Sequence, residues 1–89
     1  MEVRLYATLR SIIGGCRVTL SDDSDTIEEL LTELVESFPD LRERLLDDFG
    51  IRPHAVVMVD GRDICHLQGL ATGLAGADGV DIFPPVAGG

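Results

Sequence analysis

Residues 3–9 and 16–20 show the alternation of apolar and polar positions that is typical of strands with one buried face. The apolar side chains occupy every second position: Val3, Leu5, Ala7 and Leu9, then Cys16, Val18 and Leu20. A period of two places them on one side of a strand. A short turn closed by Gly14-Gly15 separates the two segments, so we expect two strands joined as a hairpin.

Residues 26–38 show helical spacing instead. Thr26 and Glu29 form a capping box, in which the two side chains accept hydrogen bonds from backbone N–H groups left free at the start of a helix. The apolar positions that follow lie three or four apart: Ile27, Leu30, Leu31, Leu34, Val35 and Phe38. Pro39 ends this helix, because the residue before a proline is kept out of the α region.

A second, shorter helix is expected after Pro39. Leu41, Leu45, Leu46 and Phe49 have the spacing of a stripe that faces the core. Gly50 can adopt the left-handed conformation that often follows the last turn of a helix. We therefore expect this helix to end at Gly50.

The second half of the chain returns to strand patterns. Residues 54–59 are rich in valine and methionine, Asp60-Gly61 is a hairpin turn signal, and residues 62–64 can form a brief partner strand. Residues 69–79 are rich in glycine and are expected to be a loop, and residues 80–83 resume strand character. The predicted order is ββα(α)ββ, an α+β domain.

The composition fits one globular domain with an acidic surface. The 89 residues include 16 acidic and seven basic side chains, for a formal charge of −9, and there is no lysine. Such a field disfavours nucleic acid and anionic membranes as partners and favours proteins that present basic groups. For the charge taken alone, a hydrated surface adapted to high salt, as in a halophilic organism, is the preferred interpretation.

Neither cysteine has the spacing of a disulfide framework or a zinc site. We expect Cys16 and Cys65 to be reduced and mostly buried. His54 and the adjacent Cys65-His66 pair are interpreted as structural, because neighbouring side chains on a strand point to opposite faces, and no metal site is predicted. With no signal-peptide pattern and no apolar run of membrane-spanning length, the protein is expected to be cytoplasmic.

The last six residues carry the strongest chemical signal. They are Pro84, Pro85, Val86, Ala87, Gly88 and Gly89. Two prolines fix φ and remove two backbone donors, so the chain should leave the sheet in extended form. The two glycines have no Cβ, so the final carboxylate can pass through a narrow channel in another protein. We therefore divide the chain into a folded domain, 1–83, and an extended tail, 84–89.

A terminal carboxylate must be activated before a nucleophile can attack it. Transfer of AMP from ATP to Gly89 would give a mixed anhydride that a persulfide or a thiol can attack, and this transfer needs positioned groups that stabilise phosphate. No segment of the sequence suggests such groups. We expect a partner that uses ATP and magnesium to perform this step, with the chain itself non-catalytic and without a bound cofactor.

These residues together resemble the MoaD family of ubiquitin-like sulfur carriers, which includes the archaeal small modifier proteins called SAMPs. The resemblance rests on residues 3–7 and 26–31 and, most specifically, on residues 82–89. It implies a β-grasp fold: a mixed sheet of four to five strands packed on one main helix plus a short second helix, with the first and last strands adjacent and parallel. The sequence departs from the family pattern at Asp60-Gly61, where Asn-Gly is usual, and at residues 77–80, where we expect a different loop shape.

The resemblance also implies a site and its partners. An E1-like enzyme is expected to adenylate Gly89, which then becomes a thiocarboxylate. Partners are expected to dock on the exposed sheet face near the tail, through Tyr6 and Phe83 and through the tail segment Pro84, Pro85, Val86 and Ala87, whereas Gly88 belongs with Gly89 to the reacting terminus. For Phe83, a core position is an equal alternative, because a shift of one residue moves a side chain to the other face of a strand.

Four functions share this tail. The first is the small subunit of molybdopterin synthase, which donates sulfur beside a MoaE-like large subunit. The second is a ubiquitin-like modifier joined through Gly89 to lysines of target proteins by isopeptide bonds. The third is sulfur donation for tRNA thiolation, and the fourth is a β-grasp binding module whose end is not used. Because the chain has no lysine, a modifier of this kind is expected to form mono-conjugates.

Overall fold

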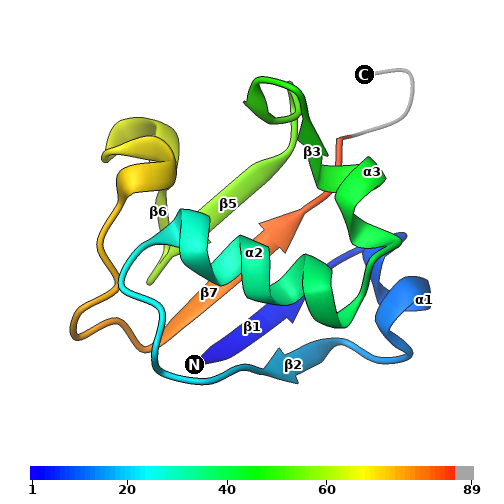
Figure 1. Cartoon of the computed structure of the whole chain (residues 1–89), viewed down its shortest axis with the longest axis horizontal. Coiled ribbons are helices and arrows are strands. Elements are labelled where there is room, and N and C mark those ends of the chain that lie inside the picture. The colour runs from blue at the N-terminus through cyan, green and yellow to red at the C-terminus, as the bar shows by residue number, and fades with distance from the viewer. Residues whose placement is uncertain (86–89) are drawn as a thin grey trace.

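The computed structural model describes residues 1–85, which fold into a five-stranded mixed sheet with helices against one face (Figure 1). The strands and helices are, in chain order, β1 (Glu2–Leu5), α1 (Leu9–Ile13), β2 (Arg17–Thr19), α2 (Ile27–Ser37), α3 (Leu41–Leu45), β3 (Leu46–Asp47), β4 (Gly50–Ile51), β5 (Val56–Val59), β6 (Arg62–Asp63), η1 (Ile64–His66), η2 (Gly69–Ala71) and β7 (Gly79–Phe83). The elements η1 and η2 are single turns of 3-10 helix.

The two strands at the centre of the sheet come from opposite ends of the chain. The strand order is β2-β1-β7-β5-β6, and β1 runs parallel to β7 with Glu2 opposite Gly79 and Leu5 opposite Ile82. The other pairs in this sheet are antiparallel. This is the β-grasp arrangement, so the predicted fold class and the adjacent, parallel first and last strands are confirmed.

Helix α2 begins where the capping box predicts. The backbone N–H of Glu29 donates to Thr26 Oγ1 at 3.3 Å, and the Glu29 carboxylate accepts from the N–H of Asp25 at 3.5 Å. The helix ends at Ser37, two residues before Pro39. Both boundaries follow from local chemistry, because the cap satisfies donors at the start and the proline prevents continuation at the end.

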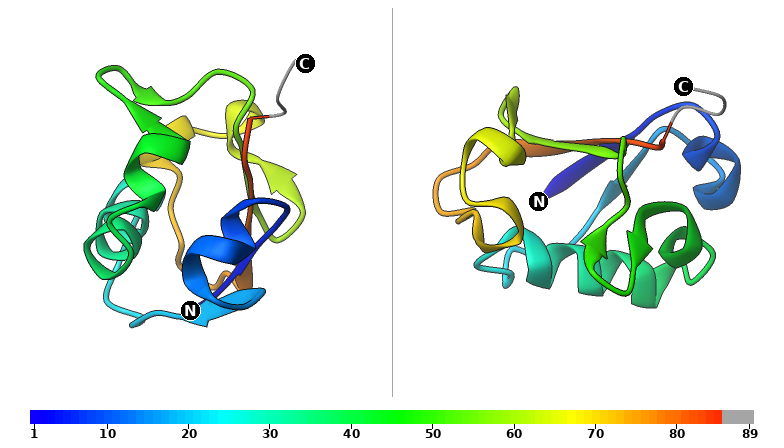
Figure 2. Two further views of the ribbon diagram at one scale, coloured as in Figure 1. Left: turned by 90° about the vertical axis from the view of Figure 1, so that its right-hand side faces the viewer. Right: turned by 90° about the horizontal axis from the view of Figure 1, so that it is seen from above.

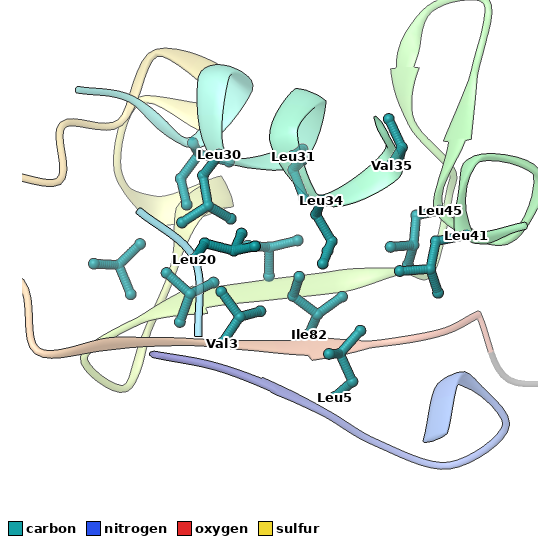
Figure 3. Packing of buried hydrophobic residues seen from close by; sticks show 14 of the residues in the cluster. Val3, Leu5, Leu20, Leu30, Leu31, Leu34, Val35, Leu41, Leu45 and Ile82 are labelled. Atoms are coloured by element: carbon teal, nitrogen blue, oxygen red, sulfur yellow. The ribbon is translucent and has the colours of Figure 1, made fainter. Parts of the chain in front are cut away.

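The core lies between α2 and the sheet. Figure 3 shows apolar side chains of α2 directed toward the sheet and side chains of β1 and β7 directed back toward α2, with α3 closing one end; the labelled residues are Leu30, Leu31, Leu34, Val35, Val3, Leu5, Ile82, Leu20, Leu41 and Leu45. All are buried. Full burial of each such side chain contributes roughly 1.5–3 kcal/mol, so this layer supplies most of the stability of the domain.

The first strand is shorter than the alternation predicts. It ends at Leu5, and Ala7 adopts a positive φ of 55° that a strand cannot contain. Leu9 instead begins the short helix α1, in which it is completely buried. The prediction of a strand through Leu9 was therefore wrong, because a buried position on a helical turn coincided with the period of the strand.

The second predicted helix is also shorter, and its last apolar residue does not face the core. Helix α3 ends at Leu45, and the chain then forms a small antiparallel hairpin, β3–β4, in which Leu46 pairs with Ile51. Phe49 lies at the tip of this hairpin and is 98% exposed. Gly50 has a φ of 125°, so it shapes the return strand and does not end a helix as predicted.

Both cysteines are exposed, so the prediction of buried thiols was wrong. Cys16 lies immediately before β2 and is not part of that strand. Cys65 lies in η1, where the predicted strand has already ended. The argument that Cys65 and His66 point to opposite faces of a strand therefore does not apply. A hydrogen bond with Asp63, together with the negative charge of that residue, raises the pKa of the Cys65 thiol and keeps it protonated.

Several of the remaining strand and turn predictions are confirmed, but the strand expected over residues 54–59 begins only at Val56, because His54 has a positive φ of 71°. Asp60 and Gly61 both have positive φ, 50° and 82°, as the predicted tight turn requires. The glycine-rich stretch is mostly loop but contains η2, and β7 begins one residue earlier than predicted, at Gly79. Within residues 1–85, no helix has the length and apolar character needed to cross a bilayer.

Candidate functional site

The parallel pairing of β1 with β7 brings Tyr6 beside Phe83 at the point where the chain leaves the sheet. Leu5 is opposite Ile82 in the register, and the N–H of Tyr6 donates to the Ile82 carbonyl at 3.2 Å. The next residues along each strand are Tyr6 and Phe83, whose rings stack with centroids 4.3 Å apart and planes 10° from parallel. An aromatic pair therefore stands at the root of the tail.

This pair lies on the outer face of the sheet, away from α2. Leu5 and Ile82, the neighbours of the two aromatic residues, are fully buried on the helix side, and successive side chains alternate between faces. Tyr6 and Phe83 are both half-buried. Of the two positions left open for Phe83, the structure therefore shows the outer face and not the core.

Asp81 joins Tyr6 to Arg4 on the same face. Its carboxylate accepts the Tyr6 hydroxyl at 2.8 Å and pairs with Arg4 through Nε at 2.7 Å and Nη2 at 3.0 Å. The Asp81 side chain is only 13% exposed. The hydrogen bond from Tyr6 to Asp81, with partial burial and the nearby negative charge, raises the pKa of the Tyr6 hydroxyl. Asp81 likewise raises the pKa of Arg4, which stays charged.

Arginine side chains surround this aromatic pair, although the chain as a whole is acidic. Arg10 Nε donates to the Leu5 carbonyl at 3.1 Å, and its guanidinium lies 5.4 Å from the centre of the Tyr6 ring. A shallow groove of about 120 Å³ is lined by Arg4, Tyr6, Arg10, Cys16 and Arg17. The face beside the Pro84-Pro85 step is thus aromatic and bears arginines, of which Arg4 and Arg17 pair with Glu2 and Arg4 also pairs with Asp81.

Sequence reasoning identified Tyr6 and Phe83 but missed Arg4, Arg10 and Asp81. The alternation of residues 3–9 does place Arg4 on the same face as Tyr6, so that signal was present in the pattern. The role of Asp81 depends on the parallel register, and that of Arg10 on the turn of helix after β1. Neither relationship can be obtained from local spacing.

The two prolines follow β7 directly and are half-buried. Proline has no backbone N–H, so Pro84 and Pro85 cannot donate hydrogen bonds that would continue the β1–β7 ladder. Val86, Ala87, Gly88 and Gly89 lie outside the described residues, and the roles expected for them stay predictions.

Metal-binding clusters and surface hollows are the other places where residues 1–85 could bind a ligand. Among these residues, no group of three or more histidine, cysteine, aspartate or glutamate side chains could hold a metal ion. A hollow of about 590 Å³ is lined by residues of the β5–β6 hairpin and of the loop before β7, among them Arg62 and Gly73. Its lining residues Asp60 and Ala77 lie near the start of β7, whereas the two prolines follow the end of that strand.

A β-grasp domain with an aromatic, arginine-bearing face at the root of a Pro-Pro step defines a ubiquitin-like protein. The chain belongs to the ThiS family, whose model matches residues 3–89. The predicted resemblance is confirmed, because the relatives described below are ubiquitin-like sulfur carriers and small modifiers.

Curated relatives match the chain over its whole length. Small archaeal modifier protein 3 of Haloferax volcanii is 39% identical over 90 residues, which cover 100% of this chain and 98% of the relative. Sulfur carrier protein CysO of Mycobacterium tuberculosis is 31% identical over 92 residues, with the same two coverages. Relatives of this chain are thus small carrier or modifier proteins.

Solved structures agree with this assignment. The crystal structure of SAMP1 from Haloferax volcanii has a TM-score of 0.82 and 32% identity, covering 99% of this chain and 97% of that one. The CysO-containing crystal structure of the BexX/CysO complex from Amycolatopsis orientalis has a TM-score of 0.84 and 25% identity, covering 99% and 98%. At least one structural relative has therefore been solved together with a partner protein.

Proposed function

We propose that this protein is a carrier whose Gly89 carboxylate is activated by an E1-like enzyme and converted to a thiocarboxylate that donates sulfur. The observation that carries the proposal is the family match, which extends through Gly88 and Gly89. It is supported by the position of the Pro84-Pro85 step beside the Tyr6–Phe83 pair. The folded body presents a docking face, and the tail is the part that reacts.

The proposed chemistry proceeds in balanced steps. A carboxylate oxygen of Gly89 attacks the α-phosphorus of ATP, pyrophosphate leaves, and an acyl adenylate forms. A persulfide on a partner attacks the acyl carbon and AMP leaves, which gives an acyl disulfide. A second thiol of the partner then attacks the sulfur of the partner's own cysteine, which breaks the S–S bond, releases the thiocarboxylate and forms a disulfide on the partner. ATP and magnesium belong to the activating enzyme, which supplies the groups that stabilise phosphate.

The outer sheet face is the proposed dock for the activating enzyme. Tyr6 and Phe83 offer rigid aromatic surface of the kind that dominates binding energy at interfaces. The guanidinium of Arg10 lies over the Tyr6 ring, where it can meet a partner carboxylate. Docking here would direct Pro84, Pro85 and the residues after them into the nucleotide site of the enzyme.

The first proposed destination of the sulfur is molybdopterin, with this chain as the small synthase subunit in the cytoplasm. A MoaE-like large subunit would receive the tail and supply the catalytic groups. What supports this destination is the sequence resemblance to MoaD, strongest over residues 82–89.

The second candidate is a ubiquitin-like modifier, and a different observation favours it. The relative with 39% identity over the full chain is named a small archaeal modifier. In this case the ε-amine of a target lysine attacks the activated Gly89 carbonyl, AMP or a thiol leaves, and an isopeptide bond forms. Sulfur donation to tRNA would use the same thiocarboxylate and a different acceptor.

The carrier proposal is tested by the intact mass of the protein isolated from its own host. We expect a fraction of the chains to carry one sulfur in place of one oxygen at the terminus. A chain that ends at Ala87 serves as the matched control and should carry none. Sulfur retained in that shortened chain would contradict the proposal.

The modifier alternative needs a suitable protease, because the last arginine is Arg62 and the chain has no lysine. Trypsin would leave residues 63–89 on each modified lysine. A protease that cleaves before aspartate would leave only residues 81–89, a remnant suited to mass spectrometry. Such remnants on lysines of many proteins would favour modification, whereas a stable complex with one large synthase subunit would favour cofactor synthesis.

A further inference from the structure

The β3–β4 hairpin holds an aromatic side chain fully in solvent. Phe49 at its tip is 98% exposed, and the other exposed large apolar side chain among residues 1–85, Leu67, is exposed by 38%. An aromatic ring left in water forgoes the burial that usually stabilises it, whereas aromatic residues are enriched at the centres of interfaces. The position of Phe49 therefore indicates a surface that is covered in a complex.

The hairpin is a fixed support for this ring. Leu46 and Ile51, which pair across the hairpin, both pack against the core. At the tip, the N–H of Phe49 donates to Asp47 Oδ1 at 2.8 Å. At the base, the N–H of Arg52 donates to the Leu45 carbonyl at 2.8 Å. A supported tip loses little conformational freedom on binding, which favours affinity.

The hairpin lies at the same end of the molecule as the root of the tail. Figure 1 shows β3 and the loop after it at the upper edge of the molecule, toward which β7 points. The left view of Figure 2 also shows the green hairpin and the red end of β7 in the upper half of the molecule. In the right view of Figure 2 the hairpin lies on the helix side and the end of β7 on the sheet side. A protein that receives the tail can therefore reach the hairpin around one end of the domain.

Charge indicates the chemistry of the surface that would cover Phe49. Asp48, its neighbour at the tip, is exposed, and no hydrogen bond or ion pair involves its carboxylate within residues 1–85. Arg42 and Arg52 line the same hollow as Asp47 and Asp48, so the charge at the base of the hairpin is mixed, whereas the chain as a whole has a formal charge of −9. Complementary potentials favour a partner pocket that is apolar inside and carries lysine or arginine at its rim.

We propose that the β3–β4 hairpin is a second docking element, in which Phe49 enters an apolar, basic-rimmed pocket of the adenylating enzyme while Asp48 faces its basic rim. This proposal rests on the proposed function, because it assumes that an enzyme receives the tail. It adds a contact on the helix side of the domain, separate from the outer sheet face. Two contacts on either side of one end would hold the domain while the tail reaches the nucleotide site.

The experiment measures pyrophosphate exchange by the purified E1-like enzyme of the source organism, with the full chain as substrate. Phe49→Ala should raise the KM for the chain about tenfold, as expected for an aromatic anchor at an interface, and leave kcat unchanged because the tail is intact. Asp48→Asn should raise KM by a smaller factor that decreases with added salt. The matched controls are Leu67→Ala and Asp23→Asn, which should leave KM close to that of the original chain.

The outcomes separate this proposal from the one on which it rests. The thermal midpoint of Phe49→Ala should equal that of the original chain, because the ring contributes no burial, so a raised KM would report binding. An unchanged KM for Phe49→Ala would overturn the hairpin proposal while leaving the carrier function in place. A dimer in solution that Phe49→Ala converts to a monomer would also overturn it, in favour of a second copy as the occupant. If the full chain supports no exchange at all, both proposals are wrong.

Discussion

The ring of Tyr6 stacks on the ring of Phe83 with 4.3 Å between their centroids. The first residue after β1 is thereby held against the last residue of β7, although 77 positions separate them (83 − 6). The contact lies where β7 ends and the Pro84-Pro85 step begins. The end of β7, from which Pro84 continues, is therefore held by a contact between segments from opposite ends of the sequence.

The stacked pair should be measurable as a coupling between its two members. Phe83→Leu keeps an apolar side chain but removes the ring, and we expect it to lower the free energy of unfolding by about 1 kcal/mol, the range of an aromatic pair. In a chain that already carries Tyr6→Leu, the effect of Phe83→Leu should be close to zero. Urea denaturation of the four chains tests this, and equal effects in both backgrounds would show that the stacking contributes nothing.

The pKa of Tyr6 predicts how stability depends on alkaline pH. The folded chain holds the Tyr6 proton more tightly than the unfolded chain, because the hydroxyl donates to Asp81 and is partly buried. The contribution of protonated Tyr6 to the free energy of unfolding is therefore fully present below the unfolded tyrosine pKa of about 10. This contribution is lost as the pH rises through the raised pKa of Tyr6 in the folded state. Stability measured in urea should fall over this range.

Two variants isolate the Tyr6 contribution. Tyr6→Phe should lose less stability than the original chain as the pH rises, because it has no hydroxyl to titrate. Tyr6 is the only tyrosine and the chain has no tryptophan, so the ultraviolet absorbance of tyrosinate reports this group directly. Asp81→Asn should move that titration to lower pH. The same midpoint of the tyrosinate titration in Asp81→Asn and in the original chain would contradict the assigned role of Asp81.

The cap of α2 provides a prediction with an internal control. Thr26→Ala removes the oxygen that accepts the N–H of Glu29, and it should lower the free energy of unfolding by about 1 kcal/mol. Thr32 lies on the exposed side of the same helix, and its hydroxyl donates to the Glu28 carbonyl. Thr32→Ala should be neutral or slightly stabilising, since alanine has the higher helix propensity. Equal losses from the two substitutions would show that the cap is not the cause.

The turn before β7 depends on a single carboxylate. Asp60 has a φ of 50° and its carboxylate accepts from the N–H groups of Asp78, at 2.9 Å, and Gly79, at 3.0 Å. Asp60→Ala should cost about 1–3 kcal/mol, because it leaves these donors without their partner. Asp60→Asn should be close to neutral, since asparagine tolerates positive φ and retains an acceptor oxygen. A large loss from Asp60→Asn, found by chemical denaturation, would mean that the negative charge itself is needed.

Much of the fold could be predicted because its signals are local. Thr26, Glu29 and Pro39 act within one turn of helix, and they determine where α2 begins and ends. Asp60-Gly61 likewise acts within one hairpin. The parallel contact of β1 with β7 was expected only through the family resemblance, because alternation shows which face is buried and says nothing of which strand lies beside it.

The errors arose where a local period continued past the end of an element. Leu9 fits the alternation of the first strand, but Ala7 turns the backbone and Leu9 reaches the core from a helix. Phe49 fits the helical spacing after Leu41, but the chain enters a hairpin at Leu46. In both cases the pattern was real for part of its length, and the change in backbone direction depends on turns that the apolar positions do not record.

The central claim is that the Gly89 carboxylate is the group on which this protein acts, and the adenylating step tests it most directly. The purified chain is incubated with its E1-like enzyme and ATP in magnesium, and the product is analysed by intact mass and by pyrophosphate exchange. We expect an adenylate on Gly89 of the full chain, and neither adenylate nor exchange with a chain that ends at Ala87. Exchange that persists with the shortened chain, or an adenylate found on any residue other than Gly89, would contradict the account.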